Sequence, residues 1–242
     1  MIRLRMSSWV GLTIGIALLG TLAAGQTAWA QTDLDLGDIA FTGYISDAPD
    51  GWSFVLLVDV AVGTEIKFTD TGWLDGGSFG DIENILFWRA TTNLPAGTEI
   101  SIDASKPLAS IGLASGDTFG LSNNGDQLFA YQDPRPSAFN QTTFVAAIQM
   151  NGNWESNPPP DGDNNRSARP SVFTDGVNSL AISPEVDNAV YDCSVTGPDT
   201  EAIRAAINDE DNWITSDSNS LTLPSGCDFS SVPVELMSFT IE

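Results

Sequence analysis

The sequence predicts an all-β protein, a two-layer antiparallel β-sandwich of the immunoglobulin-like or jelly-roll kind, with one short helix. Short runs of β-branched and aromatic residues recur along the chain, separated by Gly, Pro, Asn and Asp. Several runs, such as 65–69 and 99–103, alternate polar and apolar residues, which is typical of strands with one buried face. Many short strands with regular turns favour a sandwich.

The first thirty residues have the pattern of a signal peptide. Arg3 and Arg5 precede an apolar run at 10–24, and Ala28-Trp29-Ala30 places small residues at a cleavage site before Gln31. The apolar run has about 15 residues, short of the roughly 20 that span a bilayer. We therefore expect residues 31–242 to form one exported domain, secreted or at the cell surface of a bacterium, with no membrane span in the mature chain.

The expected strands follow one another from residue 39 to the C-terminus. The run 53–60 is nearly all apolar and suits a central strand between two layers. The predicted strands are 39–44, 53–60, 65–69, 85–89, 99–102, 118–121, 127–131, 143–148, 179–182, 220–223 and 234–241.

A short internal echo joins two of these strands, since 60–68 resembles 94–102 through a shared Gly-Thr-Glu-Ile. Gly63 and Gly97 are expected in tight turns that each begin a strand. Two copies are too few for a solenoid, so equivalent turns in two sheets are predicted. The alternation places four side chains in the core: Ile66, Phe68, Ile100 and Ile102.

One helix is expected near residue 200. Asp199 or Thr200 can cap it, and the chain at 208–209 can end it. Its apolar stripe consists of Ala202, Ile203, Ala206 and Ile207. The stripe predicts a helix that packs as a lid on the sandwich.

The composition excludes several chemistries. The chain contains no histidine, which removes Ser-His-Asp hydrolysis and histidine-ligated zinc. Residues 31–242 carry all 32 acidic residues and seven of the nine basic ones, so seven against 32 leaves a net charge of −25. Such a surface repels nucleic acids and anionic membranes and suits cations or basic partners. The alternative is that the acidity serves solubility alone.

Cys193 and Cys227 are the only cysteines. In an exported chain two cysteines most often pair, so a disulfide between the segment after Tyr191 and the C-terminal region is predicted. The alternative is two free thiols.

Three oxygen-bearing residues form a candidate calcium loop. Asp161, Asp163 and Asn165 alternate around Gly162, the spacing that a loop needs to wrap a cation. The segment 151–170, with three consecutive prolines, is expected to be an extended exposed loop, and the alternative is that it binds nothing. Asp187-Asn188 and the acidic run 209–212 are further candidates for a discontinuous metal site.

Aromatic and acidic neighbours raise the possibility of glycan binding. Trp73, Trp88 and Trp154 could stack on sugars, although tryptophans in a sandwich more often lie in the core. The acidic residues near them are Asp70, Asp81, Glu83 and Glu155. Paired carboxylates can hydrolyse glycosides without histidine, but in so acidic a chain such neighbours are also expected by chance.

Several stretches resemble a family of uncharacterised exported bacterial domains, and more distantly the lamin-tail-like sandwich. They are 37–44, 54–59, 63–73 with its Gly72-Trp73 turn, 125–131 and 187–191. The segment 232–239 is similar to the linker before a type IX secretion sorting domain. The resemblance implies a surface location and no particular activity.

The sequence therefore favours a secreted or cell-surface binding module, with polysaccharide or other cell-surface components as partners and calcium as the candidate cofactor. The alternative is a carboxylate-dependent glycan-active enzyme. A cleft with two carboxylates about 5–10 Å apart would favour the enzyme. A flat aromatic strip or a cage of oxygen atoms would favour the binding module.

Overall fold

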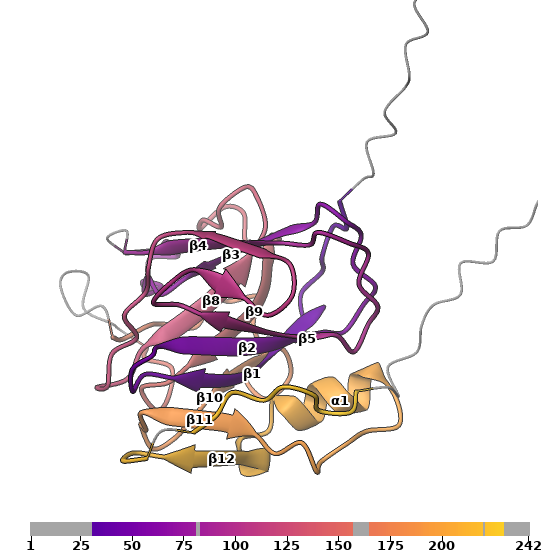
Figure 1. Ribbon diagram of the computed structural model, residues 1–242. Coiled ribbons are helices and arrows are strands. Elements are labelled where there is room, and N and C mark those ends of the chain that lie inside the picture. The colour runs from indigo at the N-terminus through magenta and orange to yellow at the C-terminus, as the bar shows by residue number, and fades with distance from the viewer. Residues whose placement is uncertain (1–30, 81–82, 157–164, 220, 230–242) are drawn as a thin grey trace, which may run out of the picture.

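The computed structural model describes residues 31–80, 83–156, 165–219 and 221–229 (Figure 1). One group of strands comprises β1 (Ile39–Ile45), β2 (Gly51–Leu56), β5 (Glu99–Asp103), β6 (Leu108–Ala109), β11 (Asn188–Tyr191) and β12 (Trp213–Ser216). The other comprises β3 (Glu65–Thr69), β4 (Ile85–Arg89), β7 (Leu113–Gly116), β8 (Gln127–Tyr131), β9 (Phe144–Gln149) and β10 (Ser179–Ala181).

These strands form two six-stranded sheets. The order in the first, called here the β1 sheet, is β12-β11-β1-β2-β5-β6. The order in the second, the β8 sheet, is β10-β9-β8-β3-β4-β7. Within both sheets the named strand pairs are antiparallel except β9 and β10, which run parallel. The predicted two-layer β-sandwich is confirmed, with one parallel pair at an edge.

Several predicted strand limits need correction. Residues 118–121 form no strand, although Phe119 and Leu121 are buried as a strand would bury them. The continuous strand in the run 53–60 ends at Leu56, after which Val60 makes an isolated bridge with Leu94, and residues 221–223 are not in a strand. The predicted strand 234–241 lies outside the described residues. Strands β6, β7, β11 and β12 were not expected, because their segments are short or carry no clear alternation.

The main core lies between the sheets and confirms the interpretation of the Gly-Thr-Glu-Ile echo. Ile66 and Phe68 on β3 and Ile100 and Ile102 on β5 are fully buried. Gly63 and Gly97 precede these strands with φ of +92° and +84°, in the left-handed region that glycine adopts at little cost. Because β3 and β5 belong to different sheets, the echo marks equivalent turns in the two layers.

A second hydrophobic cluster, called here the aromatic layer, covers the outer face of the β8 sheet. Alternate residues of β8 and β9 that point away from the main core meet aromatic side chains from the flanking loops. Its buried members are Trp73, Phe129, Tyr131, Phe144, Ala147, Ala168 and Phe173, with Phe79 and Trp154 packed against them. Phe144 contacts four of these rings, with centroids 5.1–5.8 Å apart.

The predicted helix is present as α1 (Thr200–Ile207). The Asp199 carboxylate caps it by accepting a hydrogen bond from the Ala202 N–H at 2.9 Å. Ile203 and Ile207 are buried in the main core, so α1 closes the core beside β1 (Figure 1).

Candidate functional site

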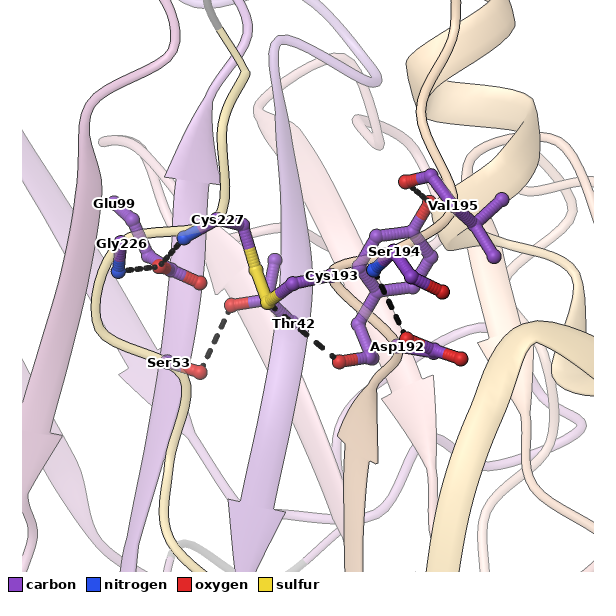
Figure 2. Close-up of a disulfide and its surroundings, with 10 residues drawn as sticks. Thr42, Ser53, Glu99, Asp192, Cys193, Ser194, Val195, Gly226 and Cys227 are labelled. Carbon is purple, nitrogen blue, oxygen red and sulfur yellow. Dashed lines mark hydrogen bonds between the residues drawn. A yellow bond between two sulfur atoms is a disulfide. The ribbon is translucent and has the colours of Figure 1, made fainter.

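The predicted disulfide is confirmed. Cys193 follows β11 by two residues, and its Cα lies 4.9 Å from that of Cys227 (Figure 2). The Glu99 carboxylate, on β5, accepts hydrogen bonds from the backbone N–H groups of Gly226 at 2.9 Å and Cys227 at 3.3 Å. Cys227 is therefore held covalently at β11 and by hydrogen bonds at β5, on either side of β1 and β2.

The disulfide anchors a segment that crosses the outer face of the β1 sheet. Residues 221–229, called here the strap, pass over small side chains of β1 and β2. A Cβ atom placed on Gly43 would lie 3.1 Å from Pro224 and 3.2 Å from Leu223, so the strap packs closely on the sheet where Gly43 has no side chain. Beneath it the hydroxyl of Thr42 donates to that of Ser53 at 2.8 Å. The strap ends at Phe229, whose ring stacks on Tyr191.

The three tryptophans do not form an exposed stacking surface. Trp73 is 2% exposed, within the aromatic layer, and Trp88 is fully buried in the main core. Trp154 is partly buried against the aromatic layer, and its indole N–H donates to Asp175 at 3.2 Å. The aromatic strip expected for sugar binding is thus absent at these positions, because hydrophobic burial places two of the three rings inside.

The acidic residues near these tryptophans serve other contacts. Asp70 is 2% exposed and accepts hydrogen bonds from the backbone and side chain of Asn84 at 3.0 and 2.9 Å. Glu155 forms an ion pair with Arg166. The backbone N–H of Glu83 donates to the Thr71 hydroxyl at 3.2 Å, and Asp81 lies outside the described residues.

A buried carboxylate that the sequence did not single out lies beside Asp70. Asp126, immediately before β8, is 5% exposed. It accepts hydrogen bonds from the N–H groups of Ser122 and Gln127 at 3.0 and 2.8 Å. Burial, followed by the negative charge of Asp70, raises the pKa of Asp126 well above its ordinary value.

The candidate calcium loop is described only at its last residue, because Asp161 and Asp163 lie outside the described residues. The Asn165 side chain donates to the Ser122 hydroxyl at 2.9 Å, and its backbone carbonyl accepts from the Asn151 side chain at 2.9 Å. Asn165 therefore ties the end of this loop to the turn that holds Asp126.

Three other carboxylates converge beside β11 and β12. Glu185 and Asp187 lie before β11, and Asp217 follows β12. One ligand oxygen from each lies within 4.8 Å of the other two. We call this group the acidic triad. The antiparallel register, in which Asn188 faces Ser216, brings Asp187 opposite Asp217.

A buried asparagine holds the acidic triad in place. Asn188 is fully buried, and its side-chain N–H groups donate to the Asp47 carboxylate at 2.7 Å and to the backbone carbonyls of Ser216 and Asn219 at 3.3 Å. One amide therefore connects the β1–β2 turn, the start of β11 and the end of β12. The hydrogen bonds of Asn188 therefore fix the loops that carry the triad, and they do not use the triad carboxylates.

The charges that shift the pKa values of Glu185 and Asp187 come from neighbouring carboxylates. Burial raises the pKa of Glu185, and Asp187 and Asp217 raise it further. Burial also raises the pKa of Asp187, followed by Asp47 and Asp217. One oxygen of Glu185 and one of Asp187 are shielded from solvent and accept no hydrogen bond from the described residues. Such oxygens favour either a proton or a cation.

The sequence identified only part of the acidic triad. Asp187-Asn188 was a candidate for a metal site and contributes Asp187, but the other candidate, the run 209–212, does not contribute to the triad. Asp209 caps a short 3-10 helix (Glu210–Asn212), and Glu210 accepts from the Ser183 N–H. Glu185 and Asp217 were missed. The alternation of Glu185 with Asp187 in the sequence could have pointed to Glu185. Asp217 could be found only from the register of β11 with β12.

Comparison of the chain with protein-family models, with curated proteins and with solved structures finds no match. Within the described ranges no helix has both the length and the apolar character needed to cross a membrane.

Proposed function

We propose that this protein is an exported surface-interaction module that binds a hard divalent cation, calcium, at the acidic triad. The convergence of Glu185, Asp187 and Asp217 is the observation that carries the proposal. Oxygens bound to one calcium ion at about 2.4 Å can lie no more than about 5 Å apart, and the triad oxygens meet that limit.

Electrostatics support a cation at this position. Asp187 and Asp217 face each other across an antiparallel pair, where like charges are destabilising. The neighbouring charges that raise the pKa values of Glu185 and Asp187 are all carboxylates. A divalent cation between them would replace this repulsion with attraction and would satisfy the two shielded oxygens.

The donor set favours calcium over transition metals. The chain has no histidine, and both cysteines are joined in the disulfide, so nitrogen and thiolate ligands are lacking. Calcium sites of extracellular modules have a Kd of about 10⁻⁴–10⁻³ M. A site with two or three carboxylates that stay partly open to water fits that range.

The signal-peptide pattern of residues 1–30, the disulfide and the acidic composition support a location outside the cytoplasm. The resemblance of several sequence stretches to exported bacterial domains would imply the same location. We propose that the module contributes to cell-surface or polysaccharide interactions, with the cation fixing the loops around β11 and β12.

Thermal unfolding of residues 31–242, with calcium and then with excess chelator, tests the proposal. At a Kd of about 10⁻⁴ M, about 2 mM calcium would stabilise the folded state by roughly 2 kcal/mol, a rise in Tm of a few degrees. Asp187→Asn removes one ligand and one repulsive charge. We expect this variant to melt above the wild type in chelator and to lose the calcium response.

The matched control is Asp75→Asn, which removes one exposed charge from a loop far along the chain from the triad. It should keep the full response to calcium. A Tm that calcium does not change would contradict the proposal. If the response instead disappears in Asp161→Ala with Asp163→Ala and persists in Asp187→Asn, calcium binds at the proline-rich loop and the triad proposal is wrong.

A further inference from the structure

One side of the sandwich is closed by a single segment, residues 107–116, called here the uncharged edge. It contains β6 and β7, which are the last strands in the orders of the β1 and β8 sheets. The link between them is fixed on the core, because the Trp88 indole N–H donates to the Ile111 carbonyl at 2.7 Å. Gly112, with φ of +84°, leaves no room for a side chain against Trp88.

The composition of this segment is unusual for the chain. Its ten residues, Pro-Leu-Ala-Ser-Ile-Gly-Leu-Ala-Ser-Gly, include no charged side chain. Leu108, Ile111 and Leu113 are 62%, 38% and 57% exposed. Edge strands are normally protected by charges that prevent pairing with another chain. The opposite edge follows that rule, since β12 lies between the acidic run 209–211 and Asp217.

We infer that the uncharged edge is a self-association surface, on which β7 of one copy pairs antiparallel with β7 of a second copy across a two-fold axis. Each β7 has a hydrogen-bonded neighbour, β4, on one side only among the described strands. Identical edges related by a two-fold axis are self-complementary. The exposed leucine and isoleucine side chains would then be buried between the two copies.

Charge is the reason to choose a second copy as the occupant. The part of the chain from residue 31 to 242 has a net charge of −25, and most of its surface repels another copy. Two of its seven basic residues border this edge, since Arg89 pairs with Leu113 in the β4–β7 register and Lys106 precedes the segment. Asp117 follows β7. Antiparallel pairing brings the Arg89 end of one strand toward the Asp117 end of the other.

The contact is small, because β7 has four residues and β6 has two. Interfaces below the standard size are weak and transient. We therefore expect an equilibrium that depends on concentration. Added salt should promote it, because salt screens the repulsion between the two acidic bodies more than it weakens an apolar contact.

Sedimentation velocity of residues 31–242 over a concentration series, in chelator and at low and high salt, tests the inference independently of calcium. The wild type should form dimers that increase with concentration and salt. Leu113→Lys, which places a charge on the edge, should remain monomeric. Ile214→Lys is the matched control, because Ile214 is a half-exposed aliphatic residue on the opposite edge strand β12. It should dimerise as the wild type does.

Amide hydrogen exchange adds a local measurement. Exchange in residues 113–116 should slow as concentration rises in the wild type and in Ile214→Lys, but not in Leu113→Lys. A wild type that stays monomeric at high concentration and salt would overturn the inference. So would dimers that Leu113→Lys leaves intact, or that Ile214→Lys removes equally well.

Discussion

The outer face of the β8 sheet carries large aromatic side chains, whereas the strap on the β1 sheet crosses Thr42, Gly43 and Ser53. The aromatic layer buries Phe129, Phe144 and the loop residues that pack on them. The strap crosses small or polar groups on β1 and β2 and is fixed by the disulfide, by Glu99 and at its end by the Phe229 ring on Tyr191. Hydrophobic burial can hold a cover without further help, at about 25 cal/mol per Å² of apolar area. A cover over small polar residues gains less from burial and depends on a covalent bond.

The largest effect should come from the aromatic layer. Phe144→Ala removes a fully buried ring that contacts Trp73, Phe79, Phe129 and Phe173. Phenylalanine-to-alanine changes in a core reduce the free energy of unfolding by about 3–5 kcal/mol, which chemical denaturation will measure. The control is Phe139→Ala, since Phe139 is fully exposed and its loss should change stability little. Equal effects would show that the aromatic layer does not act as a core.

Removal of the disulfide should have a somewhat smaller effect. Cys193 and Cys227 are 34 positions apart, and loop entropy gives such a bond roughly 3–4 kcal/mol. The double variant Cys193→Ser with Cys227→Ser should lose this stability and should be cleaved by protease within the strap. Its stability should not respond to reductant, whereas the wild type should. A strap that resists protease without the disulfide would show that packing alone holds it.

The smallest expected effect concerns pH. The pKa of Asp126 is raised in the folded state. At pH values between the ordinary pKa of an aspartate and this raised pKa, Asp126 is protonated in the folded protein and ionised in the unfolded chain. The free energy of unfolding contributed by Asp126 should therefore fall as pH rises from about 4 through the folded pKa, and level off above it. Asp126→Asn removes this contribution.

Denaturation across pH 4 to 8 will measure that difference, with Asp75→Asn as the control for a simple loss of charge. The wild type should lose stability relative to Asp126→Asn as pH rises in this range. Parallel curves would mean that the polar hydrogen bonds of Asp126 offset its burial.

The sequence by itself determined the features that depend on local pattern. Alternation placed Ile66 and Ile100 in the core, Gly63 and Gly97 marked the turns, and Asp199 marked the helix start, because each is decided by a few neighbouring residues. The disulfide followed from a pair of cysteines in a chain whose N-terminal pattern predicts export. The β-sandwich followed from the number and spacing of strands.

Tertiary structure decided what depends on partners distant in the chain. The sequence around Trp73 and Trp88 does not show whether their rings face a ligand or the core. Only the packing of the folded chain shows that both rings are buried. The acidic triad could be recognised only from the register of β11 with β12. Both strands have four residues, which is too short for a sequence pattern to predict how they pair. Phe119 and Leu121 are buried without a strand, because burial is a property of the surrounding fold, whereas strand pairing requires a neighbouring backbone in register.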